Sequence, residues 1–366
     1  MQNQTRYHGD MDHIKTPSVL RLAMLMSGLG SRERRLVAEI AGDLDPLPAL
    51  AEGGVPAAVL AGVRRVARDE APALLERVVA DGWRWLTPPD PDYPALLPAL
   101  SDPPLGLFVR GDLPNGPSTA VVGSRRATAY GRQVAGLVAR ELAAAGVAVV
   151  SGMARGVDAA AHRGALESGG PTVAVWGTGP DRVYPAEHRR LAEEIAAHGA
   201  LVTEYLPGTP PRRHHFPQRN RILAGMAPVT VVVEAAARSG ALVTARLALE
   251  EGREVFAVPG SILSHLSVGP NTLLKLGARP LLTPRDLLDE LGVPAAATAA
   301  AAAGNDGGVL AVLRGGEALA VDDLAERTRA EVPRLLAELL ELELAGHVER
   351  QPDGRYCLAR IDRTAG

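Results

Sequence analysis

Residues 121–126 read Val-Val-Gly-Ser-Arg-Arg, and this stretch decides the fold. An apolar strand over 120–122 runs into a Gly-Ser turn, and a helical pattern follows from about Ala129. Doubly wound α/β domains hold phosphate at such turns, where dinucleotide enzymes place a G-x-G-x-x-G run. Here Arg125 and Arg126 stand in the turn, and the guanidinium fork matches phosphate oxygens. The turn therefore predicts a site for an extended polyanion; the alternative is a pair of solvated loop charges.

Five further apolar runs of strand length follow this one along the chain. With the first run they occupy residues 119–123, 147–152, 172–177, 200–204, 229–234 and 254–259. Helical stretches separate them, and this alternation predicts a mostly parallel sheet with helices on both faces. We expect an α/β fold with an extended Rossmann-like sheet that occupies residues 82–291, entered through a Pro-rich stretch and a short strand over 105–109.

Composition excludes several classes of protein. The 366 residues carry a net charge of −3, so a nucleic-acid site has to be a local patch. Cys357 is the only cysteine, which excludes an intramolecular disulfide and a cysteine-cluster zinc site. No apolar run approaches the roughly 20 residues that span a bilayer. We expect a cytoplasmic protein with no membrane association, no metal and no cofactor.

The segments on either side of the predicted sheet have a different character. Residues 1–17 have the polar composition of a disordered tail, and residues 18–81 show helical apolar spacing punctuated by glycines. This small helical domain has no chemical motif, and it fits either a nucleic-acid backbone contact or a docking module. Residues 292–304 are nearly all alanine, and we interpret them as a linker rather than a helix.

Residues 305–366 predict two short helices, a longer helix over 331–344 and a hairpin, the outline of a winged helix. Eight arginines stand against twelve acids in this segment, and Glu338, Glu341 and Glu343 lie on the expected recognition helix. A DNA-reading helix needs a basic face. The charges therefore favour a protein contact or a regulatory role over duplex binding.

Two of the other strand ends also carry candidate groups. The second strand ends in Ser-Gly-Met-Ala-Arg-Gly, which places Arg155 beside the first turn. Asp158 and His162 follow four residues apart, without a third metal ligand or a nucleophile, so we assign them to capping and packing. After the fifth strand, Ser239 and Gly240 open a helix, where Ser239 is a good N-cap and free amides would attract an anion.

The longest basic segment follows the fourth strand, and residues 206–233 contain no acid. Cations that track a phosphate backbone, beside an aromatic ring on which a base stacks, are typical of single-strand binding. The candidate DNA-binding residues of this segment are Arg212, Arg213, His214, His215, Phe216, Arg219, Asn220 and Arg221. We expect the last three to start a helix. The alternative is a solvated loop over a buried Phe216.

Together these turns resemble the DNA-processing protein A family (DprA, also called Smf). The resemblance covers about 93–291 and is carried by Val122-Gly-Ser-Arg-Arg, Ser151-Gly-Met-Ala-Arg-Gly-Val-Asp, Thr203-Glu-Tyr, Pro207-Gly-Thr, Phe216-Pro-Gln-Arg-Asn-Arg-Ile, Val255-Phe-Ala-Val-Pro-Gly and Gly269-Pro-Asn. It implies a single-stranded DNA-binding mediator that protects incoming strands and loads the RecA recombinase in natural transformation and repair. It also implies a homodimer through the Rossmann-like domain, a helical N-terminal domain of sterile-alpha-motif type and a C-terminal winged helix.

The resemblance places DNA contacts on Gly123, Ser124 and Arg125, on the loop 212–216, and on Ser239 and Gly240. Asn220 is expected either to contact DNA or to hold the loop together. Family members often carry a lysine in the basic loop, and this chain has arginine and histidine there.

Two other functions, an enzyme and an adaptor, compete with strand binding. Related phosphoribohydrolases use a P-G-G-x-G-T-x-x-E block, and the equivalent stretch from Ser239 lacks the glutamate, so we expect no enzyme. The second is an adaptor in which the winged helix makes the essential contact.

Overall fold

A computed structural model describes the chain in two compact units, 1–295 and 296–366. The described residues are 16–38, 45–293, 309–313, 318–328, 330–344, 347–351 and 353–358. Most of the predicted disordered tail and of the predicted alanine-rich linker lies outside these ranges. The limits proposed for these two segments therefore stay predictions.

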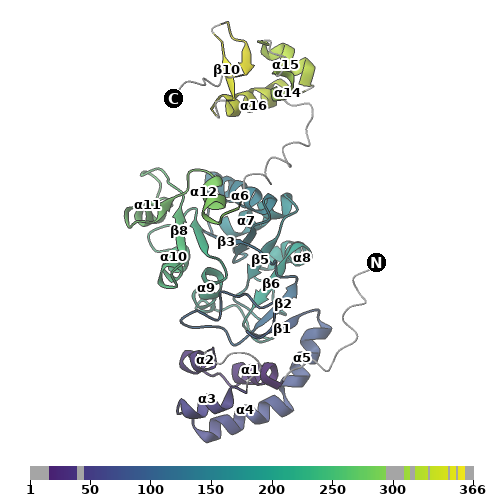
Figure 1. Cartoon of the computed structure of the whole chain (residues 1–366), viewed down its shortest axis with the longest axis vertical. Helices are drawn as coiled ribbons and strands as arrows, with labels where there is room; N and C mark the ends of the chain where they lie inside the picture. The colour runs from purple at the N-terminus through teal and green to yellow at the C-terminus, as the bar shows by residue number, and fades with distance from the viewer. Residues whose placement is uncertain are drawn as a thin grey trace. The chain divides into compact units, whose positions relative to one another are not determined.

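The first unit is built on a nine-stranded sheet in the order β1-β2-β6-β5-β4-β3-β7-β8-β9. All neighbours from β6 to β9 pair in parallel, and β1 and β2 add an antiparallel edge. This confirms the predicted α/β fold (Figure 1). The strands are β1 (Arg84–Leu86), β2 (Leu107–Gly111), β3 (Ser118–Val122), β4 (Ala148–Ser151), β5 (Thr172–Val175), β6 (Ala200–Thr203), β7 (Val229–Val232), β8 (Glu254–Ala257) and β9 (Arg279–Pro280).

Helices cover both faces of the sheet because alternate strand residues point to opposite sides. Val121 and Val149 pack with α6 (Ala129–Ala144) and α7 (Val157–Glu167), together with α12 (Arg285–Glu290). Val122 and Val150 pack on the other face, against α9, α10 and α11. These three helices span His215–Gly225, Gly240–Glu250 and Val268–Lys275. Burial on both faces explains why the strands are continuous apolar runs.

The N-terminal helices share a core with the sheet. They are α1 (Thr16–Met26), α2 (Ser31–Ala38), α3 (Leu47–Glu52), α4 (Ala57–Asp69) and α5 (Ala71–Ala80). Their apolar residues form one cluster with strand residues and with α8 (Arg189–His198). The ring centroids of Trp83 and Trp176 are 5.6 Å apart, and Trp85 Nε1 donates to the Ser18 carbonyl at 3.2 Å. The region is helical, as expected, and it is packed onto the sheet.

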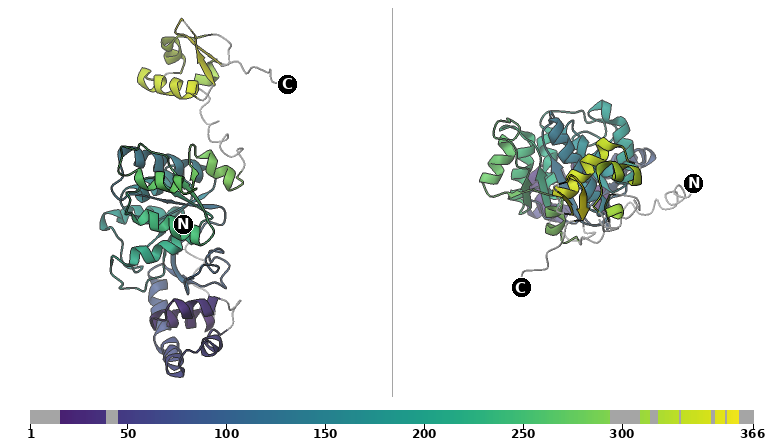
Figure 2. Two further views of the ribbon diagram at one scale, coloured as in Figure 1. Left: turned by 90° about the vertical axis from the view of Figure 1, so that its left-hand side faces the viewer. Right: turned by 90° about the horizontal axis from the view of Figure 1, so that it is seen from above.

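The second unit has its own apolar core. It contains α14 (Val309–Leu313), α15 (Val321–Thr328), α16 (Val332–Leu344), β10 (Val348–Arg350) and β11 (Tyr356–Leu358). Leu335 and Leu339 of α16 are buried with Leu324 and Tyr356. The two strands form an antiparallel hairpin, drawn in yellow in Figure 2. The predicted three helices and hairpin are confirmed.

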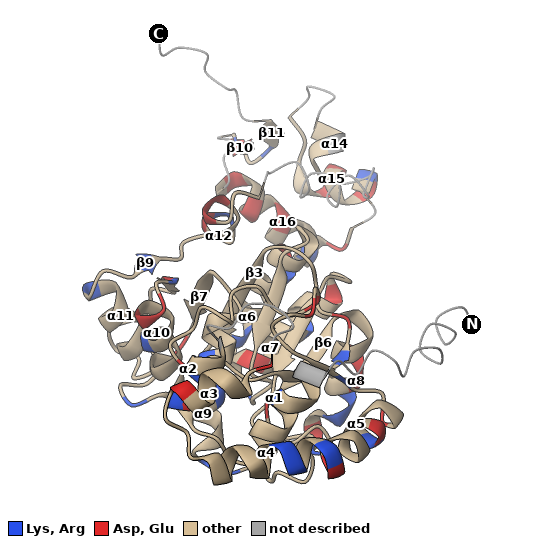
Figure 3. Cartoon of the chain, turned by 60° about the horizontal axis from the view of Figure 1, so that its bottom comes forward, with Lys and Arg blue, Asp and Glu red and all other residues tan. Residues whose placement is uncertain are grey.

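Charges of both signs are interspersed on the helices that Figure 3 displays, in keeping with the small net charge of the chain. Among the helices of the described residues, none is both long enough and apolar enough to cross a membrane. The same residues include no group of three or more His, Cys, Asp or Glu side chains that could hold a metal ion.

Candidate nucleic-acid interface

The order of the strands places a crevice between β3 and β7. From β3 the chain winds outward through β4, β5 and β6, and then returns to the other side of β3 to form β7, β8 and β9. Loops that leave the carboxyl ends of β3 and β7 therefore diverge in opposite directions. Such a switch point is where open parallel sheets bind ligands.

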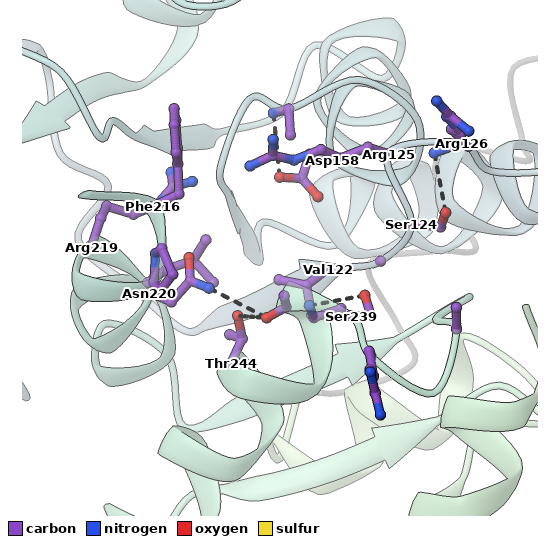
Figure 4. Close-up of a pocket in the computed structure, with 18 of the residues that line it drawn as sticks. Val122, Ser124, Arg125, Arg126, Asp158, Phe216, Arg219, Asn220, Ser239 and Thr244 are labelled. Atoms are coloured by element: carbon purple, nitrogen blue, oxygen red, sulfur yellow. Dashed lines mark hydrogen bonds between the residues drawn. The ribbon is translucent and has the colours of Figure 1, made fainter. Parts of the chain in front are cut away.

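A hollow of about 670 Å³ lies at this switch point. Five arginines and one aspartate line it, and the aspartate is Asp158. Figure 4 shows the residues around it, with Ser239 and Thr244 on the α10 side. From the predicted site, the hollow brings together Gly123, Ser124, Arg125, Arg126, Arg213, Phe216, Arg219, Asn220, Ser239 and Gly240.

The β3 turn is fixed by the end of the neighbouring strand β7. Ser124 N donates to the Glu234 carbonyl at 2.6 Å. The Glu234 carboxylate accepts from the amide and the hydroxyl of Thr128, at 2.9 and 2.6 Å. The Ser124 hydroxyl accepts from the amide of Arg126 at 3.1 Å. The turn backbone is therefore held while the side chains of Arg125 and Arg126 remain exposed.

The β4 turn packs directly against the β3 turn, and this contact requires glycine. Gly156 has φ +79°, and a Cβ there would lie 2.2 Å from the Ser124 carbonyl oxygen. Its neighbour Arg155 is paired with a carboxylate, since its Nε lies 2.5 Å from Glu187 Oε1. Arg155 does not line the main hollow, but it lines a smaller hollow together with Arg125, Phe216 and Arg219, so its charge does lie beside the first turn. A contact between Arg155 and a DNA strand stays a prediction.

The basic loop leads into α9, which starts at His215 and not at Arg219 as the sequence predicted. Pro217 is compatible with this start, because proline is tolerated in the first turn of a helix. The side chains of Arg212, Arg213 and His214 are exposed. His215 is buried instead and stacks on Tyr205, with ring centroids 4.5 Å apart. The predicted cationic loop is therefore present without His215.

Phe216 and Arg125 come from distant parts of the chain and meet at the hollow. The Arg125 guanidinium carbon lies 5.0 Å from the centroid of the Phe216 ring, within cation–π distance. The Tyr184 ring lies 5.3 Å from the Phe216 ring. Phe216 is half-buried, so part of its ring remains open to a ligand.

Arg219 places a second, buried cation at the hollow. It is 3 % exposed, and its Nη1 donates to the Gly152 carbonyl at 3.2 Å. Its Nε has no hydrogen-bond partner among the described residues. Burial lowers the pKa of Arg219 to about 10, a shift that the nearby Asp158 opposes and the neighbouring Arg125 reinforces. Arg219 thus remains a cation at neutral pH, with a donor still unused.

The start of α10 supplies backbone donors beside these cations. Ser239 is the N-cap, and its hydroxyl accepts from Ala241 N at 3.2 Å, as predicted. Asn220 Nδ2 donates to the Gly240 carbonyl at 3.3 Å, so Asn220 ties α9 to α10. A helix N-terminus exposes N–H groups and the positive end of the helix dipole. The arrangement is able to bind a phosphate.

Arg221 belongs to a different environment, and its predicted strand contact does not fit its position. Its guanidinium is buried and donates to both Glu204 oxygens at 2.6 Å and to Asp102 at 2.9 Å. Burial alone would lower the pKa of Arg221, but the two carboxylates raise it. Asp102 also pairs with Arg34 of α2 at 2.9 Å. Arg221 therefore braces α9 against the sheet and the N-terminal helices.

Asp158 and His162 have the structural roles expected of them. An oxygen of the Asp158 carboxylate accepts from Ala154 N at 3.3 Å. His162 is buried, its Nδ1 lies 2.7 Å from the Thr172 hydroxyl, and burial lowers its pKa to about 3. The imidazole is therefore neutral and packed under the turn.

A family model described as DNA recombination-mediator protein A matches residues 84–292, more than half of the chain. The chain belongs to this family. A second model, the DprA winged helix domain, matches residues 293–354. Protein Smf of Escherichia coli K12 is 42% identical over 290 residues, which cover 75% of this chain and 78% of that protein. The DNA processing protein DprA of Bacillus subtilis is 41% identical over 202 residues, which cover 54% of this chain and 68% of that protein.

Solved structures of two DprA proteins resemble the chain. The structure from Streptococcus pneumoniae has a TM-score of 0.66 at 35% identity and covers 75% of this chain and 98% of that one. The structure from Helicobacter pylori has a TM-score of 0.51 at 30% identity, covering 57% of this chain and 95% of that one. The Helicobacter pylori protein is described as having a unique single-stranded DNA binding mode.

Three residues of the site were not predicted from the sequence. Tyr184 lines the hollow beside Phe216, and Arg238 adds an exposed guanidinium at the α10 side. Glu234 holds the β3 turn. A polar residue directly after a buried strand was the available signal for Glu234, whereas nothing local marks Tyr184.

Proposed function

We propose that this DprA protein binds single-stranded DNA in the hollow at the β3–β7 switch point. The observation that carries the proposal is the charge of the lining, which has five arginines and one aspartate in a chain whose net charge is −3. A local positive patch of this kind binds phosphates through counterion release. The single-stranded DNA binding mode described for the Helicobacter pylori protein supports this choice of ligand.

The site offers separate contacts for phosphate and base. Arg219, Arg125 and the N-terminus of α10 provide charge and N–H donors for phosphate oxygens. The open part of the Phe216 ring provides a stacking surface that accepts any base. A duplex keeps its bases stacked inside, so the ring selects an unpaired strand. We therefore infer low sequence specificity.

We further propose a non-enzymatic role, in which the protein protects incoming strands and loads RecA during natural transformation and DNA repair in the cytoplasm. Membership of a recombination-mediator family supports the role. A phosphoribohydrolase is the competing proposal, and Asp158 is its best acid because it lines the hollow. The Asp158 carboxylate accepts a hydrogen bond from the backbone amide of Ala154. Assays for base release from nucleoside monophosphates should show no turnover. RecA should assemble on single-stranded DNA faster in the presence of this protein than in its absence.

The proposed homodimer forms through the Rossmann-like domain. Apolar side chains are exposed around α11 and the edge strand β9, with Ile262 at 90 % and Leu263 at 93 % exposure and Leu276 and Leu282 also open. Large apolar side chains left in solvent are candidates for an interaction surface. Replacing Ile262 and Leu263 by Asp should give a monomer in light scattering if this surface forms the dimer.

A titration of labelled oligo-dT at two salt concentrations tests the strand-binding proposal. Affinity should fall steeply with salt, with a slope of about −0.7 per phosphate contacted. Duplex of the same length serves as the competitor and should compete weakly. Salt-independent binding, or equal affinity for duplex, would contradict the proposal.

A further inference from the structure

Helix α9 is held from the face opposite to its strand ligands. At 3.6 residues per turn, Phe216, Arg219 and Asn220 share one face of this helix, and Arg221 and Gly225 share the opposite face. The three residues of the first face line the hollow at the switch point. Contacts on the second face therefore decide where these ligands stand in the hollow.

Residues 100–102, which we call the bridging segment, run along the second face of α9. Leu100 packs directly on Gly225, because a Cβ on this glycine would lie 2.7 Å from Leu100 Cδ1. One helical turn earlier, Asp102 Oδ2 accepts from Arg221 Nε at 2.9 Å. The bridging segment is therefore attached to the C-terminal half of α9 at two points.

The bridging segment also reaches α10, whose N-terminus lies at the hollow. Ser101 donates to Glu251 Oε1 through its amide, at 3.1 Å, and through its hydroxyl, at 2.5 Å. Glu251 is the C-cap of α10, whereas Asn220 is bonded to Gly240 at the other end of that helix. The two helices are thus tied to each other at the hollow and to one common segment away from it.

The N-terminal helices hold the bridging segment through Arg34 of α2. Arg34 donates to Asp102 twice, from Nε to Oδ1 and from Nη2 to Oδ2, both at 2.9 Å. The two side chains are 19 % and 29 % exposed, so the pair is partly shielded from water. A two-pronged arginine–carboxylate pair fixes orientation as well as distance, which an ordinary surface ion pair does not.

Asp102 therefore joins α2 to α9. Burial alone would raise the pKa of Asp102, but the guanidinium groups of Arg221 and Arg34 lower it, so the shared carboxylate is charged at neutral pH. A hollow of about 470 Å³ lies beside it and is lined by residues of both helices, Arg34 and Gln218 among them. The joint consists of directional hydrogen bonds at the edge of this hollow, so one substitution in α2 is enough to open it.

We propose that Arg34 and Asp102 are positioning residues for strand binding, through which the N-terminal helices hold the ligands of α9 in place without touching DNA. This role rests on the proposed function of the hollow at the switch point and adds the N-terminal helices to it. When the bridging segment is loosened, α9 is no longer pre-organised, and ordering its ligands on binding costs affinity. Strand affinity then depends on Arg34, which does not line that hollow.

The affinity of the full chain for oligo-dT tests the proposal. Arg34→Ala should weaken binding by about 2- to 30-fold, the range over which residues remote from a site modulate it. Arg34→Lys keeps one donor for Asp102, and its affinity should lie between those of Arg34→Ala and the parent. Arg32→Ala is the control, because Arg32 lies on the same helix and its contact, with the Gly53 carbonyl at 3.0 Å, stays within the N-terminal helices. The control should bind as tightly as the parent.

Two further measurements separate positioning from a general loss of stability. In the free protein, backbone amides of α9 should exchange with deuterium faster in Arg34→Ala than in Arg32→Ala. In a Phe216→Ala background, Arg34→Ala should weaken binding by a smaller factor than in the parent, because one of the ligands that it positions is already absent.

Parental affinity in folded Arg34→Ala, unchanged exchange in α9 or an equal factor in both backgrounds would overturn the positioning role and leave the hollow as the strand site. A parent that does not bind oligo-dT would overturn the proposed function and the positioning role with it. If thermal melts show that Arg34→Ala is unfolded, Glu251→Ala loosens the bridging segment from α10 and leaves the N-terminal helices intact. It should weaken binding over the same range, and parental affinity in that variant would equally overturn the role.

Discussion

Replacing Phe216 by alanine isolates the contribution of base stacking to strand binding. The Phe216 ring is half-buried, and it contacts the Tyr184 ring at 5.3 Å and the Arg125 guanidinium at 5.0 Å. Gly177 lies behind it, where a Cβ would come within 3.0 Å of the ring. Alanine removes the open surface of the ring and leaves the arginines and the α10 N-terminus in place.

The loss follows from the value of one stacked base. Stacking on an aromatic side chain contributes about 1–3 kcal/mol per base. At about 1.4 kcal/mol per tenfold change, Phe216→Ala should weaken oligo-dT binding by about 5- to 150-fold. The salt dependence should keep its slope, because no cation that contacts phosphate is removed.

Fluorescence anisotropy of labelled oligo-dT, with two further variants, separates stacking from packing. Phe216→Tyr retains the ring face and should bind nearly as well as the parent, whereas Phe216→Leu fills space without a π surface and should resemble alanine. Thermal melts confirm that each variant is folded. Parental affinity in Phe216→Ala or in Phe216→Leu, or an altered salt slope, would refute the assignment of Phe216 as a stacking platform.

Three other substitutions have outcomes fixed by their surroundings. Arg213→Ala removes an exposed cation at the hollow, so the magnitude of the salt slope should drop by about 0.7 with no change in melting temperature; an unaltered slope would exclude a phosphate contact. Arg221→Ala leaves the buried Glu204 unpaired and should lower the free energy of unfolding by about 3–5 kcal/mol in urea titrations, whereas the exposed Arg246→Ala should change it little. Gly156→Ala should lower the melting temperature and weaken strand binding together, because its Cβ would displace the β3 turn. Parental values in that variant would show that the two turns are independent.

The strands and the turns that follow them were predictable because each signal is local. A buried parallel strand is an apolar run, and the turn after it shows its glycines and arginines in sequence. The short edge strands β1 and β9 were missed since their three and two residues give no run of that kind. The start of α9 was misplaced by four residues: the helix begins at His215, and Pro217 lies in its first turn.

Roles within the basic segment depend on partners far away in the chain. Arg219 and Arg221 are two residues apart, but α9 turns Arg219 toward the hollow and Arg221 toward Asp102, which lies 119 residues earlier. Arg155 is likewise paired with a residue on another element, Glu187. Nothing in the local sequence distinguishes a cation that meets a buried carboxylate from one that remains open to ligand.

A crystal structure of the protein with oligo-dT tests the central claim most directly. We predict a phosphate at the N-terminus of α10 within hydrogen-bond distance of Arg219 or Arg125, and a base lying on the open part of the Phe216 ring. A strand bound at another surface, with the β3–β7 hollow empty of nucleotide, would contradict it.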